Sequence, residues 1–227
     1  MNPPSLDSIE LLLERARHHG ADAADAVLFE TVDISVSQRL GNPEGLERSE
    51  NRAIGLRAFV GAQQAIVSSS DILSGSLDEL AERAVSMARV APADPDSKLA
   101  PTFLYPNSTI DLDLCDVKEP SADWLQEQAR IVEYTARSIK GITNSEGADA
   151  HYGKNTISLG IMQKGAITFS HCYDTSHMSL SVSVLAGTDT AMERDYDFTS
   201  ARHRTDLQDA ASIGKSAATR ALSRLNP

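Results

Sequence analysis

The stretch from Gly141 to Ser200 constrains the fold most, because its apolar residues recur at every second position. Short polar turns such as Gln163-Lys164-Gly165 and Tyr173-Asp174-Thr175-Ser176 separate the runs. A period of two with short turns is typical of antiparallel strands joined by hairpins. Such a sheet buries one face and exposes the other, so the rest of the chain must supply an apolar cover. The alternating positions are Ile157, Leu159, Ile161, Ile167, Phe169, Met178, Leu180, Val182, Val184, Met192, Arg194, Tyr196 and Phe198.

Four other segments carry apolar residues at helical spacing and are predicted to be helices. Serines stand where the N-caps of the first three belong, and the one at Ser76 fits a capping box. The helical stripes run from Leu6 to Ala16, Leu77 to Met87, Leu125 to Ile139 and Ile213 to Leu225. Further strands are predicted near residues 27–36, 54–60 and 65–70.

The order of these elements predicts an α+β fold with two antiparallel meander sheets, each backed by helices. Residues 1–91 would form a first unit of helix, strands and helix. Residues 92–120 are rich in proline and aspartate, which is typical of a surface linker. Residues 121–227 would form a second unit of helix, five-run sheet and helix.

Composition narrows the class of protein. The net charge of -11 argues against a nucleic-acid partner, which needs a basic surface. No apolar run approaches the roughly 20 residues that span a bilayer, and the N-terminus lacks the features of a signal peptide. Two cysteines, Cys115 and Cys172, do not make a disulfide framework. We therefore expect a cytoplasmic protein with reduced thiols and no membrane partner.

Motifs that carry chemistry are absent from the sequence. Gly214-Lys215-Ser216 is similar to the end of a phosphate-binding loop, but the earlier glycine is missing and no strand precedes it. There is no His-Glu-x-x-His helix of a zinc peptidase. His171, Cys172 and His177 are close in sequence, yet strand geometry points neighbouring residues to opposite faces. We therefore predict no catalytic residue and no metal ligand in this chain.

Three stretches resemble one protein family. They are Gly55–Gly61 with the following Gln64–Ser70, then Ile142–Ala148, and most specifically Leu180–Phe198. Together, in this order, they resemble the TldD/PmbA family of bacterial peptidase subunits, and within it the N-terminal part of the PmbA type, also called TldE. The resemblance extends from the first helix through Arg220.

The resemblance implies a heterodimeric zinc metallopeptidase in the cytoplasm that acts on unstructured polypeptides. Zinc would be held only by the TldD-type partner, while the PmbA type would be a non-catalytic half. Family roles include maturation of a peptide antibiotic, degradation of an antitoxin and an older link to modulation of DNA gyrase. An isolated chain of this kind is expected to bind no stoichiometric zinc and to be inactive as an enzyme.

The family fold would continue into a large β-rich C-terminal domain, which this sequence does not contain. The leading hypothesis is the N-terminal portion of a PmbA-like subunit that works only with a TldD-like partner. An alternative is a stand-alone module that binds extended peptides at a sheet edge. A third is an inactive truncated relic.

Arg194 is the charge whose position is hardest to explain. It shares the parity of the apolar residues in the last run, so a regular strand would point it to the buried face. A buried guanidinium needs a carboxylate or several carbonyls to offset its desolvation. The candidate partners are Glu146 within the second unit and a carboxylate of a missing domain or partner subunit. In the alternative, a bulge after Gly187 reverses the strand and leaves Arg194 solvated. The candidate structural or interface residues are Arg194, Glu193, Asp195, Tyr196, Asn144 and Glu146.

Overall fold

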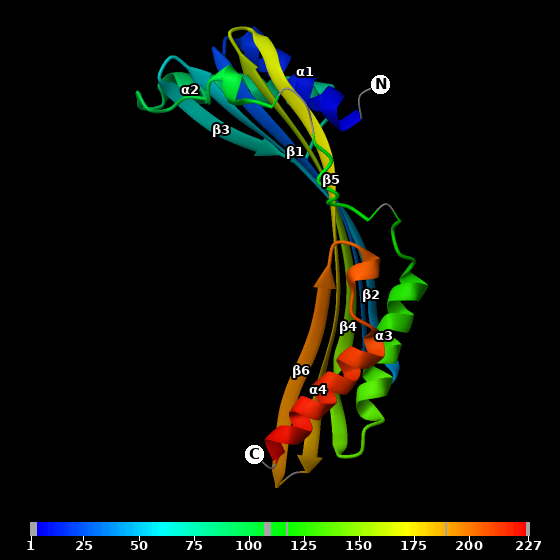
Figure 1. Cartoon of the computed structure of the whole chain (residues 1–227). Helices are drawn as coiled ribbons and strands as arrows, with labels where there is room; N and C mark the ends of the chain where they lie inside the picture. The colour runs from blue at the N-terminus through cyan, green and yellow to red at the C-terminus, as the bar shows by residue number, and fades with distance from the viewer. Residues whose placement is uncertain (1–3, 107–109, 117, 189, 226–227) are drawn as a thin grey trace. The chain divides into compact units, whose positions relative to one another are not determined.

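The computed structural model describes residues 4–106, 110–116, 118–188 and 190–225 (Figure 1). Within these residues it confirms the four predicted helices and adds two short 3-10 helices, η1 and η2. The elements are α1 Pro4–His19, β1 Ala23–Arg39, β2 Asn42–Val60, β3 Gln63–Ser69, α2 Ser74–Val90, η1 Thr102–Leu104, α3 Ala122–Arg137, β4 Ile142–Gln163, β5 Ala166–Thr188, β6 Ala191–Ala201, η2 Arg204–Asp206 and α4 Ala210–Leu225. None of the described helices is long and apolar enough to span a bilayer.

The strands form one six-stranded sheet in the order β3-β2-β1-β4-β5-β6. The α+β class is confirmed, but the expected division into two sheets is corrected. Four of the strands are long, with 17 residues in β1, 19 in β2, 22 in β4 and 23 in β5. The polar segment from Tyr173 to Ser176, expected to be a turn, lies in the middle of β5. Alternation of apolar residues fails to reveal a strand that continues through a polar stretch.

The chain divides into two compact units that do not follow the boundaries at residues 91 and 121. Unit 1 comprises Met1–Thr31, Asn51–Leu112 and Asn155–Asp174, and unit 2 comprises Val32–Glu50, Asp113–Lys154 and Thr175–Pro227. The long strands β1, β2, β4 and β5 each contribute residues to both units. Strand pairing therefore interleaves segments that are far apart in sequence, which a linear division of the chain cannot represent.

In unit 1, α1 and α2 pack on one face of the sheet. The α1 residues Ile9, Leu12, Leu13 and Ala16 are fully buried and form one helical stripe. They share a hydrophobic core with α2, β1, β2, β3 and β4. The main strand and α2 contributors are Ala24, Ala26, Leu28, Ile54, Leu56, Ala58, Val67, Leu77, Leu80, Ala81, Ala84, Val85 and Met162.

In unit 2, α3 and α4 cover one face of the sheet in the same way. Small residues on both helices allow close packing, and a Cβ added at Gly214 of α4 would collide with the α3 backbone. Among the described residues of this unit, no helix lies on the opposite face of the sheet. The core comprises Ile34, Val36, Leu125, Ala129, Val132, Ala136, Ala148, Ala150, Tyr152, Met178, Leu180, Val182, Val184, Ala186, Ala210, Ile213, Ala217, Ala218 and Ala221.

A fully buried carboxylate, Glu133 of α3, fixes the turn between β1 and β2. It accepts hydrogen bonds from Leu40 N at 2.6 Å, Gly41 N at 2.9 Å and Gln38 Nε2 at 2.9 Å. Leu40 and Gly41 both have positive φ, which directs their N–H groups toward one anion. Burial alone would raise the pKa of Glu133, but these donors and the Ser145 hydroxyl together hold it below its ordinary value.

The predicted linker at residues 92–120 is irregular in its described parts, apart from η1. It is nevertheless hydrogen-bonded within each unit. Asp94 N donates to Ala62 O at 2.7 Å in unit 1, and Asp116 N donates to Ser176 Oγ at 2.7 Å in unit 2. The segment is therefore attached at both ends and is more than a free connection.

Candidate interaction site

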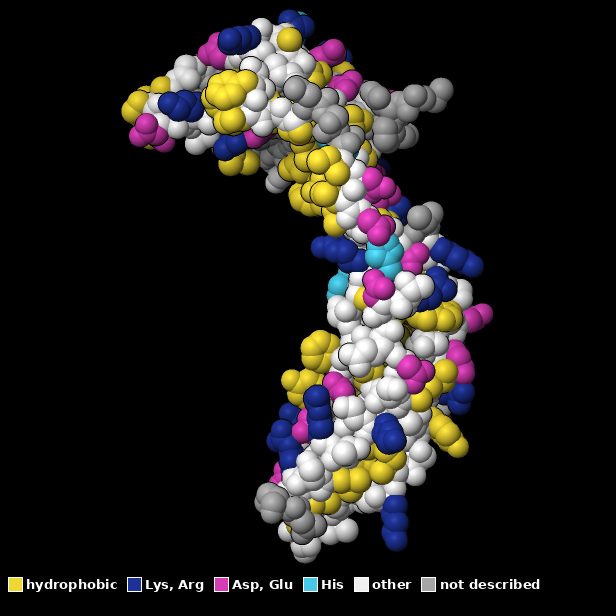
Figure 2. Space-filling model, viewed as in Figure 1, with side chains coloured by type: hydrophobic (Ala, Val, Ile, Leu, Met, Phe, Trp, Pro, Cys, Tyr) yellow, Lys and Arg dark blue, Asp and Glu magenta, His cyan; other side chains and the backbone are white. Residues whose placement is uncertain are grey.

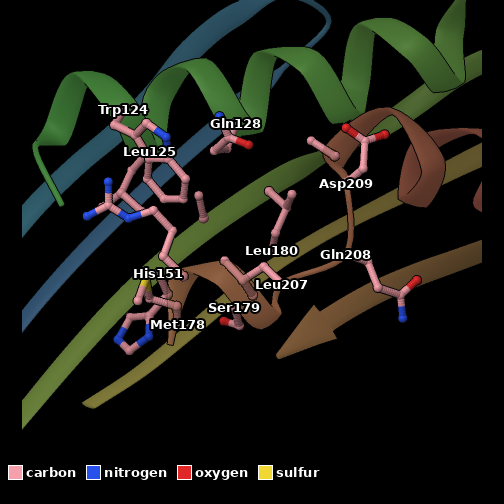
Figure 3. Close-up of a pocket in the computed structure, with 13 residues that line it drawn as sticks. Trp124, Leu125, Gln128, His151, Met178, Ser179, Leu180, Leu207, Gln208 and Asp209 are labelled. Carbon is pink, nitrogen blue, oxygen red and sulfur yellow. The ribbon is translucent and has the colours of Figure 1, made fainter. Parts of the chain in front are cut away.

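A small cavity lies in unit 2 between α3 and the strands that it covers (Figure 3). Its volume is about 140 Å³, a size that holds a benzene-sized group. Trp124, Leu125 and Gln128 extend toward it from α3, and the connection from β6 to α4 closes another side. The remaining lining residues are Ala150, His151, Met178, Ser179, Leu180, Arg204, Leu207, Gln208, Asp209 and Ala210.

Arg204 forms one wall of this cavity. Its Cζ lies 4.8 Å from the centroid of the Trp124 ring, within the range of a cation–π contact. Its Nη2 donates to Lys118 O at 3.1 Å, and its backbone N–H donates to the Asp116 carboxylate at 2.9 Å. That backbone N–H lowers the pKa of Asp116. These contacts join the segment before α3 to the segment before α4, so Arg204 has a structural task here.

The histidines of the sheet do not assemble a metal site. His151 Nε2 lies 3.3 Å from Asp33 Oδ1, and the rings of His151 and His177 are 5.9 Å apart. Cys172 Sγ, by contrast, lies 3.9 Å from the Ser5 hydroxyl of α1. Throughout the described ranges, no three His, Cys, Asp or Glu side chains converge closely enough to hold a metal ion.

The expected faces of β6 are reversed. The Arg194 side chain is 64% exposed, so its predicted burial is wrong. Tyr196 is exposed as well, whereas Asp195 is buried and Glu193 half-buried. The β5–β6 register explains this, because it places Asp195 opposite the inward-facing Val184. That face is covered by α4, whose basic side chains neutralise the acidic residues beneath it.

The predicted partner of Arg194 is nevertheless the observed one. Arg194 Nη1 lies 3.2 Å from Glu146 Oε2 on the open face, and Ser183 Oγ donates to the same oxygen at 2.7 Å. The Ser183 hydroxyl and the Arg194 charge lower the pKa of Glu146. Asn144 takes no part, because its Oδ1 accepts from the adjacent Ser145 N at 2.8 Å. Since the pair is exposed, its net contribution to stability is small.

A network between β6 and α4 escaped the sequence analysis. Arg224 Nε donates to Asp195 Oδ2 at 2.7 Å, and Arg220 Nη1 lies 3.5 Å from Asp197 Oδ1. The side chains of Asp195 and Asp197 are only 10% and 15% exposed. The only sequence signal of this contact is the spacing of its residues. The two acids are two residues apart on a strand, and the two arginines are four apart on a helix. Hydrophobic and charged side chains gather along the β6 side of unit 2 (Figure 2).

Unit 1 has an apolar hollow on the sheet face opposite α1 and α2. Its volume is about 400 Å³. Arg57 and Asp25 form a bidentate pair at its margin, with distances of 3.0 Å and 2.5 Å, and this pair raises the pKa of Arg57. The lining residues are Asp25, Ala26, Val27, Gly55, Leu56, Arg57, Ile66, Leu159, Gly160 and Ile161.

The sequence of the chain matches family models of known proteins. Residues 24–88 match the family model described as PmbA/TldA metallopeptidase domain 1, and residues 169–225 match the PmbA/TldA metallopeptidase central domain. The chain belongs to the PmbA/TldD family. The two matches cover β1 through α2 and most of β5 through α4, so both units contribute to the family pattern.

Curated relatives of this PmbA/TldD chain are metalloprotease PmbA proteins. The Escherichia coli O157:H7 protein is 33% identical over 212 residues, which cover 91% of this chain and 45% of that protein. The Haemophilus influenzae homologue is 31% identical over 225 residues, covering 97% of this chain and 48% of that protein. The chain thus spans about half the length of the curated relatives that it matches.

Solved structures show the same fold. A Bacteroides thetaiotaomicron protein, described as a candidate modulator of DNA gyrase, has a TM-score of 0.79 at 20% identity, over 95% of this chain and 49% of that one. TldE from Thermococcus kodakarensis has a TM-score of 0.78 at 15% identity, over 95% of this chain and 47% of that one. At these identities the likeness supports the PmbA/TldD fold of the chain and no functional detail.

Proposed function

We propose that this chain is the N-terminal portion of a PmbA/TldE-like, non-catalytic subunit. In this proposal it joins a TldD-like subunit in a cytoplasmic, heterodimeric zinc metallopeptidase that acts on unstructured polypeptides. The observation that carries the proposal is the family match, with 33% identity to metalloprotease PmbA over 212 residues and matches to both domain 1 and the central domain.

The side chains of this chain support the non-catalytic role. The sequence has no His-Glu-x-x-His motif, and the described part of the chain brings no three metal-ligating side chains together. Zinc, which polarises a carbonyl and activates a water in such enzymes, would therefore be held by the partner. This chain would contribute surfaces that bind the partner and the polypeptide.

Co-expression with a TldD-type subunit from a PmbA-containing bacterium tests the proposal. The chain carries an affinity tag, and the co-purified complex is assayed for subunit ratio, zinc content and cleavage of a labelled unstructured polypeptide. We expect co-purification, about one zinc per heterodimer, and activity that is absent from this chain alone. The tagged chain loaded with zinc is the control. One tightly held zinc in that control, or peptide cleavage by it, would contradict the proposal.

A second candidate function is recognition of extended polypeptides at a sheet edge. It is favoured by one observation, the exposure of the first half of β2. Every residue from Asn42 to Glu50 is exposed except Ser49, which is half-buried. Binding of peptides by the isolated chain, without a TldD-type subunit, would separate this candidate from the first.

A further inference from the structure

The first half of β2 is an open edge of unit 2. Pairing between β2 and β3 begins at Ile54↔Ser69, so β3 does not reach residues 42–50. In the sheet order, β1 lies on the other side of β2. Within the described residues, β2 from Asn42 to Glu50 therefore has a strand along one side only. An open strand edge presents backbone N–H and C=O groups that fit another extended backbone.

The other edge of unit 2, at β6, is occupied by its own side chains. Tyr196 N donates to Asp195 Oδ1 at 2.8 Å, and Phe198 N donates to Asp197 Oδ1 at 2.9 Å. Arg220 Nη1 donates to Tyr196 O at 3.3 Å. A strand that added to β6 would have to displace all three contacts. The described residues show no comparable side-chain contacts to the backbone of residues 43–50.

The charges of the open β2 edge are predominantly acidic and partly unpaired. Arg48 is engaged already, since it lies 2.9 Å from Glu50 Oε1 and 2.6 Å from Glu119 Oε1. Neither Glu44 nor Glu47 has an ion-pair partner among the residues that the structure describes. Two exposed carboxylates without partners favour a cation on any strand placed beside them.

We propose that the edge of β2 from Asn42 to Glu50 binds an extended, basic segment of polypeptide by strand addition. The proposal deepens the second candidate function, because it specifies the edge and the class of polypeptide. The backbone of β2 would supply the hydrogen bonds, and Glu44 and Glu47 would select the charge. Pro43, which has no N–H, marks the N-terminal limit of the donor row.

The positions of the two glutamates define the ligand further. Residues three apart on a strand point to opposite faces, so the bound segment needs basic residues three positions apart, one on each face. Leu46 is 54% exposed and shares the Glu44 face on a regular strand. In an antiparallel arrangement the ligand would therefore read basic, apolar, any residue, basic. The same charges oppose the pairing of two β2 edges with each other, since acidic residues would meet acidic residues.

Fluorescence anisotropy with designed peptides tests this. The probe is a blocked, labelled peptide with the core Lys-Leu-Thr-Lys between threonines, and its counterpart carries Glu-Leu-Thr-Glu. We expect the basic peptide to bind the full chain and the acidic one to fail. Two further peptides carry N-methyl groups on alternate backbone amides, one at the odd and one at the even positions. Only one of the two should lose binding, because a β-strand directs every second amide toward its neighbour.

Charge variants test whether Glu44 and Glu47 contact the bound peptide. Glu44→Lys combined with Glu47→Lys should weaken binding of the basic peptide about tenfold at low salt, with less effect at high salt. Glu79→Lys combined with Glu82→Lys is the matched control, because it makes the same charge change on exposed residues three apart on a helix. The control should bind as the parent chain does. Circular dichroism confirms that each variant is folded.

Hydrogen–deuterium exchange then identifies the protected strand. Protection of residues 42–50 by the basic peptide is the expected result. Equal weakening by the helix control, protection of β3 or β6 instead, or no binding of the basic peptide would each overturn the proposal. None of these outcomes bears on co-purification with a TldD-type subunit, so the two proposals fail separately.

Discussion

Removal of the buried carboxylate of Glu133 should be among the most destabilising single changes in unit 2. Glu133 is 0% exposed and forms no ion pair in the described residues; backbone and side-chain donors stabilise its charge. Glu133→Ala would leave Leu40 N, Gly41 N and Gln38 Nε2 without their acceptor. The turn that they form would then lose its anchor on α3.

The magnitude follows from the number and burial of these donors. An unsatisfied buried donor costs about 1–3 kcal/mol, and water can reach part of this site, because the contacts of Leu40 and Gly41 are only partly buried. We therefore expect Glu133→Ala to lower the free energy of unfolding by about 3–5 kcal/mol. That is a large fraction of the roughly 5–15 kcal/mol that holds a domain folded. Glu133→Gln keeps one acceptor oxygen and should cost roughly half as much.

Urea unfolding followed by tryptophan fluorescence measures this directly. Trp124 is the only tryptophan in the sequence, and it lies on α3, so its emission reports on unit 2. With a slope of about 2–3 kcal/mol per M urea, the Glu133→Ala midpoint should fall by roughly 1–2 M. Glu127→Ala on the same helix is the control. Its carboxylate lies 2.7 Å from Arg130 Nη2 with both side chains about half exposed, so its removal should shift the unfolding midpoint far less than Glu133→Ala does.

The pH dependence provides an independent check. The folded-state pKa of Glu133 is below the unfolded value, so its contribution is fully present above the unfolded pKa of about 4.3. That contribution is lost as the pH falls through the folded-state pKa. The stability difference between the parent chain and Glu133→Gln should therefore be constant from pH 6 to 8 and shrink below about pH 4. A difference that stays constant to pH 3, or a Glu133→Ala cost no larger than that of Glu127→Ala, would refute the reasoning.

Three other predictions follow from single contacts. Arg194→Ala should cost under about 1 kcal/mol in urea unfolding, because its pair with Glu146 is exposed; a loss above 3 kcal/mol would contradict the observed exposure. Gly214→Ala should lower stability by about 1–3 kcal/mol, since its Cβ would collide with α3, whereas an unchanged melting temperature would mean that the helices can separate. Asp195→Ala combined with Asp197→Ala should free two backbone donors of β6 and promote self-association, measured by light scattering against concentration; a monodisperse variant would show that the edge is protected by other means.

The sequence predicted the elements well and their faces less well. Helical stripes such as Leu125 to Ile139 are reliable because burial on a helix needs apolar residues every three or four positions. On β6, alternation correctly grouped Met192, Tyr196 and Phe198 on one face but did not show which face is covered. The burial of that strand is decided by α4, whose Arg220 and Arg224 pair with Asp197 and Asp195. No local pattern contains that information.

Glu133 shows a second limit of pattern reading. It occupies the apolar stripe of α3, four residues after Ala129 and three before Ala136, where a carboxylate would usually be taken as solvated. Its donors come from the β1–β2 turn and from β4, which are distant in sequence. A charged residue inside a helical stripe does indicate a tertiary contact. It does not indicate which residues form that contact.

The two edges of unit 2 are both acidic, but their carboxylates make different contacts. β6 carries acidic residues at every second position, at Glu193, Asp195 and Asp197, whereas the first half of β2 carries them at every third, at Glu44, Glu47 and Glu50. Each is typical of an edge protected by charge. On β6 the carboxylates of Asp195 and Asp197 turn toward α4 and toward their own backbone, so the charge closes the edge. On β2 no helix supplies arginines to Glu44 and Glu47 within the described residues, and the same kind of charge remains directed outward. The same two carboxylates would therefore repel the acidic β2 edge of another copy and attract a basic strand. Which of these happens depends on the charge of the approaching strand.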